Sequence, residues 1–81
     1  MQISELKDYV ETGRELEFKV DGIMCSITYG TINDKEVISF CEFNQPSIEV
    51  TSFEELLKVT YNEKSLKSIW ENLKPEDLWI F

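Results

Sequence analysis

The chain contains no histidine, only two cysteines, two prolines and three glycines, and no long apolar run. Without histidine it lacks the commonest general base and the commonest metal ligand of proteins, which disfavours catalysis. The three glycines are scattered, so no glycine-rich loop is available to bind phosphate. No run of roughly 18 apolar residues is present to span a membrane, and the first eight residues lack the pattern of a secretory signal. We therefore expect a cytoplasmic protein that is not an enzyme and holds no cofactor.

Cys25 and Cys41 are the only thiols. A disulfide is disfavoured because no secretion signal is visible. Two thiols complete a zinc site only if carboxylates or a second chain supply the other ligands. We predict two small apolar side chains, with metal binding as the open alternative.

A chain of 81 residues, 42% of them hydrophobic, predicts one domain over residues 1–81. A chain this short buries only about 60–65% of its unfolded surface, so its core requires helices pressed on a single sheet. The pattern of elements described next predicts an α+β fold: one helix, a three-stranded antiparallel meander, then two helices packed on one face of the sheet.

The stretch 15–43 predicts the three strands, over residues 15–20, 23–30 and 36–43. Asp21-Gly22 between alternating apolar runs is a strong hairpin signal, because both turn positions need positive φ. A two-residue turn pairs Phe18 with Cys25, and this register places apolar side chains of all strands on one face. The predicted core face is Leu16, Phe18, Val20, Ile23, Cys25, Ile27, Tyr29, Ile38 and Phe40.

The rest of the chain predicts helices and short extended pieces. Residues 4–12 favour a helix capped by Ser4, and residues 53–58 a second helix, opened by a capping box of Ser52 and Glu55. A third helix is expected from Asn62 or Ser65 to the Lys74-Pro75 step. Residues 48–50 form a short extended piece, and the apolar tail 78–81 is expected to dock, with a short C-terminal strand as one form.

The second face of the predicted sheet is only partly polar. It carries the apolar residues Met24, Val37, Cys41 and Phe43. Such a cluster is typical of an interface, including a homodimer contact, or of a surface covered by another part of the chain. We favour coverage by the tail and keep the interface as the alternative.

Sixteen acidic residues against eight basic ones give a net charge of −8. That charge disfavours direct binding to nucleic acid or anionic lipid and favours a partner with a basic surface. Between Lys35 and Lys58 the chain has five acidic residues and no basic one: Glu36, Glu42, Glu49, Glu54 and Glu55. These five are the predicted partner-binding residues, and solubility with protection of an edge strand is the alternative reading.

The order of elements, in a small acidic chain without histidine, resembles that of some type II-A anti-CRISPR inhibitors of phages. The stretch Ile38-Ser39-Phe40-Cys41-Glu42-Phe43 is similar to small proteins of Gram-positive bacteria and their phages. The resemblance implies carboxylates that occupy the region where a CRISPR nuclease reads DNA with arginines. The expected function is a non-enzymatic, phage-encoded inhibitor, monomeric or homodimeric, of a CRISPR nuclease or another nucleic-acid-handling enzyme. The alternative is an assembly protein that oligomerises through the second sheet face.

Overall fold

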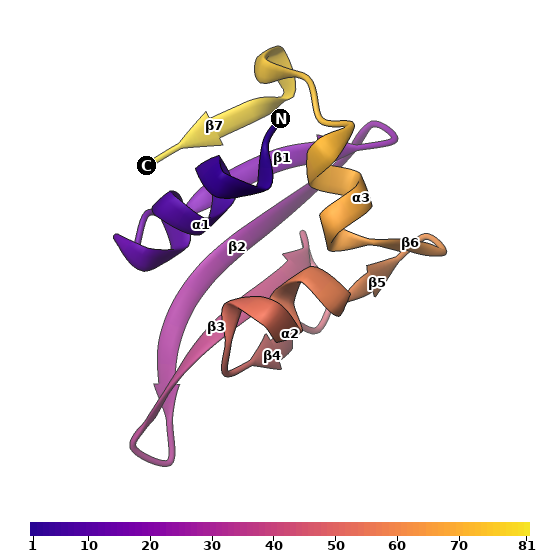
Figure 1. Cartoon of the computed structure of the whole chain (residues 1–81). Helices are drawn as coiled ribbons and strands as arrows, with labels where there is room; N and C mark the ends of the chain where they lie inside the picture. The colour runs from indigo at the N-terminus through magenta and orange to yellow at the C-terminus, as the bar shows by residue number, and fades with distance from the viewer.

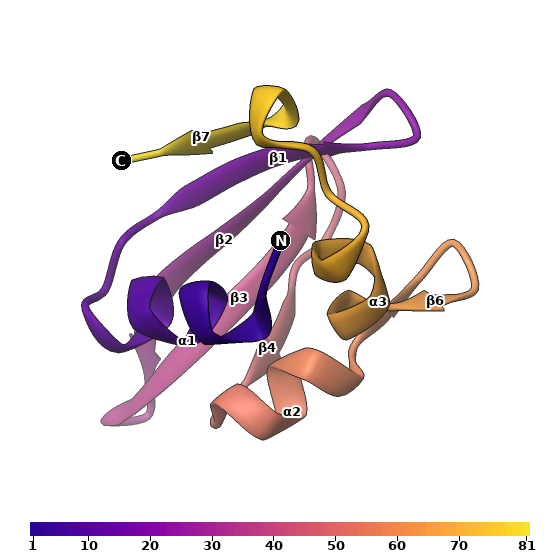
Figure 2. The same cartoon turned by 45° about the horizontal axis from the view of Figure 1, so that its top comes forward.

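The core of the fold is a five-stranded antiparallel sheet, with three helices on one of its faces (Figures 1 and 2). A computed structural model describes all residues, 1–81. The strands lie in the order β4-β3-β2-β1-β7, and a two-stranded β5-β6 hairpin lies apart. This arrangement confirms the α+β prediction. The elements are α1 (Ile3–Glu11), β1 (Leu16–Val20), β2 (Ile23–Ile32), β3 (Lys35–Glu42), β4 (Ile48–Val50), α2 (Phe53–Lys58), β5 (Thr60–Tyr61), β6 (Lys64–Ser65), α3 (Leu66–Glu71), the 3₁₀ helix η1 (Pro75–Asp77) and β7 (Leu78–Ile80).

The first hairpin has the predicted register. Leu16 lies opposite Ile27, and Phe18 lies opposite Cys25. Asp21 and Gly22 have φ of 52° and 81°, as a two-residue turn with positive φ at both positions requires. The turn and the apolar alternation agree, so the register of β1 and β2 is fixed locally.

The second hairpin is longer and tighter than predicted. β2 continues past Gly30 to Ile32, and β3 begins at Lys35. Asn33 and Asp34 have φ of 51° and 65°, so this turn also has two residues. Asparagine and aspartate tolerate the left-handed region better than other non-glycine residues, which explains why no glycine is needed. The predicted face is nevertheless confirmed, since Ile27 pairs with Phe40 and Tyr29 with Ile38.

The helix boundaries correct two predictions. α1 is preceded by Gln2 as its N-cap, not capped by Ser4, and the Gln2 main-chain nitrogen donates to the Glu5 carboxylate at 3.3 Å. α3 begins after Ser65, whose hydroxyl accepts from the Ser68 main-chain nitrogen at 3.1 Å. Asn62 is instead part of the β5–β6 turn, and α3 ends at Glu71, before the predicted Lys74.

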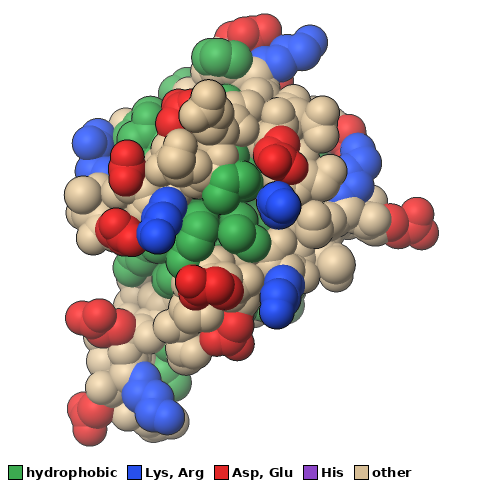
Figure 3. Space-filling view, in the orientation of Figure 1, with side chains coloured by type: hydrophobic (Ala, Val, Ile, Leu, Met, Phe, Trp, Pro, Cys, Tyr) green, Lys and Arg blue, Asp and Glu red, His purple; other side chains and the backbone are tan.

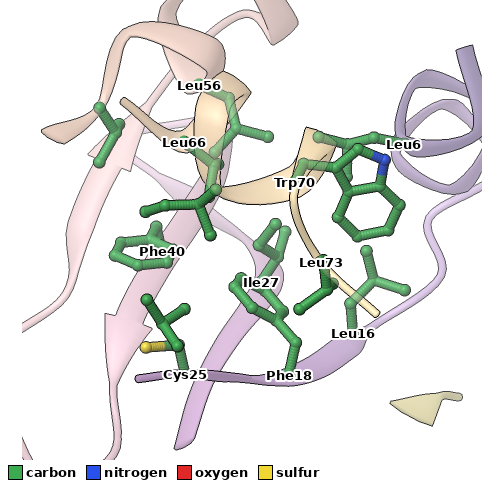
Figure 4. Packing of buried hydrophobic residues seen from close by; sticks show 13 residues of the cluster. Leu6, Leu16, Phe18, Cys25, Ile27, Phe40, Leu56, Leu66, Trp70 and Leu73 are labelled. Carbon is green, nitrogen blue, oxygen red and sulfur yellow. The ribbon is translucent and has the colours of Figure 1, made fainter. Parts of the chain in front are cut away.

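Trp70 of α3 lies in the core beside Leu6 and Leu16 and has no exposed surface (Figure 4). Its ring lies edge-on to Phe18 of β1, with ring centroids 6.5 Å apart, and its indole nitrogen donates to the Gln2 carbonyl at 2.8 Å. Leu6 of α1 and Leu56 of α2 belong to the same buried cluster. One tryptophan therefore joins the helices to the sheet. The predicted core residue Ile23 is 42% exposed, because it lies at the end of β2 beside the turn.

The C-terminal tail forms β7 and adds to the free edge of β1. Phe18 lies opposite Leu78, and Leu16 lies opposite Ile80. Pairing with β1 satisfies main-chain groups that an open sheet edge would leave without partners. The prediction that the tail covers Met24, Cys41 and Phe43 is therefore wrong, since the tail extends the sheet in its own plane.

Candidate binding surface

The five predicted partner-binding glutamates do not share one surface. Glu36 and Glu42 are even-numbered residues of β3, like the buried Phe40, so they lie on the helix-bearing face. Glu49 of β4 pairs with Ser39 and lies on the other face. Glu54 and Glu55 are in the first turn of α2. The alternation of side chains along a strand separates residues that the linear charge run groups together.

Glu42 is engaged inside the fold and is not a free surface charge. Its carboxylate accepts a hydrogen bond from the Tyr61 hydroxyl, and Tyr61 also packs edge-on against Phe40. That hydrogen bond raises the pKa of Tyr61 well above its usual value. Glu42 therefore holds the β5–β6 hairpin against the sheet.

Glu55 combines capping with an exposed charge. Its carboxylate accepts from the Thr51 hydroxyl at 2.7 Å, and its main-chain nitrogen donates to the Ser52 hydroxyl at 3.1 Å. The hydrogen bond from Thr51 lowers the pKa of Glu55, and the nearby Lys58 contributes in the same direction. The carboxylate is therefore ionised at neutral pH.

An open groove lies on the helix-bearing face where the helical layer is incomplete. Its lining comes from the C-terminal end of α1, from Thr51 just before α2, and from the facing parts of β2 and β3. The backbone course of these four elements can be followed in Figures 1 and 2. The volume of the groove is about 670 Å³. We call it the α1–α2 groove, and its lining residues are Val10, Glu11, Thr12, Gly13, Tyr29, Gly30, Thr31, Glu36, Val37, Ile38 and Thr51.

Three carboxylates surround the α1–α2 groove. Glu11 and Glu36 line it, and Glu55 is hydrogen-bonded to Thr51, which also lines it. Glu11 was not among the predicted site residues, because only the packing of α1 beside β2 and β3 brings it near Glu36. The groove thus combines negative charge with the apolar side chains of residues such as Val10.

Few of the carboxylates in the chain are neutralised. Acidic and basic side chains both occur on the helix-bearing face (Figure 3). Only two ion pairs form, Lys7 with Glu11 and Lys64 with Asp21, both at 3.8 Å and both more than half exposed. Exposed pairs of this kind contribute only about 0–1 kcal/mol. Most of the acidic side chains therefore remain available to a partner.

Tyr29 closes the floor of the groove beside α1. Its hydroxyl donates to the Arg14 carbonyl at 2.8 Å. Burial, with a smaller effect of the nearby Glu15, raises the pKa of Tyr29 to about 12. The floor therefore stays uncharged at neutral pH, and the charge of the groove comes from the carboxylates at its rim.

Three of the predicted interface residues, Met24, Cys41 and Phe43, lie away from the helices, whereas Val37 also lines the α1–α2 groove. Val37 and Cys41 of β3 and Met24 of β2 alternate with the core residues of those strands. Phe43 follows β3, donates its main-chain N–H to the Met24 carbonyl, and is 42% exposed. Met24 and Cys41 are half-buried, and Val37 is 9% exposed. No helix covers this face of the sheet (Figure 2).

The structure contains neither a disulfide nor a cluster of side chains placed to hold a metal ion. Both cysteines are free, and burial raises the pKa of Cys25 to about 11. No group of three or more cysteine, aspartate or glutamate side chains is placed to hold a metal ion. None of the helices has the length and apolar character needed to cross a bilayer. No protein-family model, curated protein or solved structure matches the chain.

Proposed function

We propose that this protein is a non-enzymatic inhibitor that binds a basic protein surface through the carboxylates of the α1–α2 groove. The observation that supports this proposal is the position of Glu11, Glu36 and Glu55 around one open groove in a chain of net charge −8. Glu54, in the same helical turn as Glu55, adds to this negative surface. Glu42 and Glu49 are not part of the proposed contact.

Arginine and lysine side chains match both properties of the groove. Their charged ends pair with carboxylates, and their methylene stems pack on apolar surface such as Val10 and Ile38. The net charge of the chain also speeds encounter with a positive partner, an effect that salt screens. Basic side chains are concentrated in proteins that hold nucleic acid.

The proposed partner is a nucleic-acid-handling enzyme, and the resemblance in element order favours a type II-A CRISPR nuclease in the cytoplasm of a bacterial host. Such a nuclease reads DNA with arginines and holds nucleic acid in positive channels. A carboxylate-rich protein seated there competes with DNA phosphates for the same basic side chains. Inhibition by this route needs no catalytic group on the inhibitor.

The test is DNA cleavage by a guide-loaded type II-A nuclease in the presence of the wild-type chain, Glu36→Lys and Glu76→Lys. Both substitutions change the net charge by the same amount, but exposed Glu76 lies in η1, away from the groove. Glu36→Lys should weaken inhibition about tenfold, which corresponds to about 1.4 kcal/mol, and Glu76→Lys by much less. If both variants lose inhibition equally, the effect comes from net charge alone and the groove is not the contact.

A second experiment tests whether the groove binds basic side chains, independently of which protein is the partner. A soluble arginine-rich peptide should bind the wild-type chain, and its affinity should fall as salt is raised from about 0.05 M to about 0.5 M. Peptide binding that depends on Glu36, without inhibition of the nuclease, would show that the nuclease is not the partner. Binding that is unchanged across the salt series would exclude the electrostatic mechanism.

A further inference from the structure

We propose that two copies of this chain pack face to face through the sheet face that carries no helix. We call it the open face. It consists of the odd-numbered residues of β1, β3, β4 and β7 and the even-numbered residues of β2. This inference concerns a different surface from the α1–α2 groove and does not rest on the proposed function.

The charge of the open face favours a second copy over a basic partner. Its charged residues are Glu17, Lys19, Lys35 and Glu49, whose formal charges sum to zero in a chain of net charge −8. The surplus of negative charge therefore lies outside this face. A basic surface gains no net attraction from the open face, whereas two copies of it meet with cations and anions in equal number.

The side chains at the centre of the open face are small and uncharged. Ser26 and Thr28 of β2 lie opposite Cys41 and Ser39 of β3, and all four are half-buried. Short side chains at the centre allow two sheets to approach to the usual distance of about 10 Å. No desolvated charge would be left at the middle of the contact.

Large apolar side chains border this centre. Trp79 of β7 is 41% exposed, and Ile32 of β2 is 46% exposed. Lys19 lies over the Trp79 ring with its nitrogen 5.8 Å from the ring centroid, which leaves the rest of the indole open. Met24 lies opposite Lys19 of β1, and Phe43, which bonds to Met24 from the β3 side of β2, adds exposed apolar surface. Aromatic and methionine side chains of this kind are enriched in protein interfaces.

The area of the open face suits a weak dimer. The five strands contain 5, 10, 8, 3 and 3 residues. With a rise of about 3.3 Å per residue and a strand spacing of about 4.8 Å, they cover about 460 Å² per copy. Two copies would together contribute about 900 Å² of strand area, close to the roughly 1,000 Å² at which specific interfaces begin. The contact should therefore form at high concentration and dissociate on dilution.

Sedimentation equilibrium of the full chain tests this proposal. The apparent mass should rise from 9.5 kDa toward twice that value between about 10 µM and about 1 mM protein. A mass that stays at 9.5 kDa over the whole range overturns the proposal. A heterologous partner for this face, rather than a second copy, would give that monomeric result.

Two matched variants identify the surface. Thr28 and Thr31 lie on the same strand, but Thr28 belongs to the open face and Thr31 lines the α1–α2 groove. Thr28→Lys should raise the dissociation constant of the dimer at least about tenfold, and Thr31→Lys should leave it within about twofold. If both variants lose the dimer equally, or only Thr31→Lys does, a different surface is responsible. Ser39→Glu replaces Thr28→Lys if the latter does not keep the wild-type circular dichroism spectrum.

Salt distinguishes self-association from the proposed function. Two chains of net charge −8 repel each other at long range, so added salt should strengthen the dimer. Binding of a basic peptide in the groove should weaken under the same conditions. A dimer that weakens with salt would mean that ion pairs between the copies dominate, which contradicts a contact with an uncharged centre.

Discussion

The β5–β6 turn contains a strained residue, as comparison with the other two hairpin turns shows. We therefore predict that a substitution in this turn changes the stability of the protein. Its central residues, Asn62 and Glu63, have φ of 52° and 65°. The corresponding second position in the first hairpin is Gly22, with φ of 81°. Glutamate has a Cβ and no short polar group to favour the left-handed region, so Glu63 is the strained member of the set.

The expected size of the effect follows from backbone energies. The left-handed conformation costs a non-glycine residue about 1–2 kcal/mol, and glycine costs about 0.5–1 kcal/mol through its larger entropy in the unfolded chain. Glu63→Gly should therefore stabilise the protein by about 0.5–1 kcal/mol, and Gly22→Ala should destabilise it by a similar amount. A Cβ at Gly22 would have no atom within 4 Å, so crowding does not add to that cost.

Thermal unfolding followed by circular dichroism measures both changes. For a chain of this size, 1 kcal/mol shifts Tm by about 4–8 °C, so the two variants should move Tm by several degrees in opposite directions. Glu63→Gln removes the charge but keeps the strain, and should leave Tm nearly unchanged. A lower Tm for Glu63→Gly, or no change for Gly22→Ala, would refute the left-handed turn geometry.

Three further predictions concern the core and the buried polar groups. Leu56→Ala should lower the free energy of unfolding in urea by about 2–5 kcal/mol, because Leu56 has no exposed surface. Tyr61→Phe should lower the free energy of unfolding by about 1–3 kcal/mol, because it removes the hydrogen-bond donor to the Glu42 carboxylate. A smaller decrease would mean that water takes the place of the Tyr61 hydroxyl. Folding raises the pKa of Cys25 from 9.0 to about 11 and that of Tyr29 from 10.0 to about 12. The folded state then binds these protons more tightly, so Cys25 and Tyr29 should leave the urea midpoint unchanged between about pH 7 and about pH 9 and lower it as the pH rises toward 12.

The first hairpin was predictable from sequence because two local signals coincide. Asp21-Gly22 specifies the turn, and the alternation around Phe18 and Cys25 specifies the face. The β5–β6 hairpin was missed because its strands have two residues each and its turn contains Glu63, which is not a typical turn residue. Asparagine also favours helix starts, so the sequence predicts Asn62 as one of two starts for the third helix.

The position of the tail was not predictable from local patterns. The apolar composition of residues 78–81 predicted docking, and β7 confirms a short C-terminal strand. Both β1 and the outer strand of the meander offered an open edge, and no turn fixes the register of a strand that returns from a distant helix. The predicted cover over Met24 and Cys41 was wrong for this reason.

The candidate site was predictable only in part. The run of acids includes Glu36, which lines the groove, and Glu55, which is hydrogen-bonded to Thr51 beside it, and their role in binding a partner stays a prediction. Glu54 precedes Glu55 in the first turn of α2. The same run includes Glu42 and Glu49. Strand alternation places Glu49 on the other face of the sheet, and the carboxylate of Glu42 is hydrogen-bonded to Tyr61. Their participation in binding stays a prediction that the structure does not favour.

Backbone chemical shifts of the isotope-labelled chain, recorded while an arginine-rich peptide is added, test the central claim most directly. The account predicts that the first and largest changes occur at Glu11, Glu36, Thr51 and Glu55, around the α1–α2 groove. Changes confined to the open face, such as those at Ser26 and Thr28, would contradict it. An absence of any change at low salt would contradict it as well.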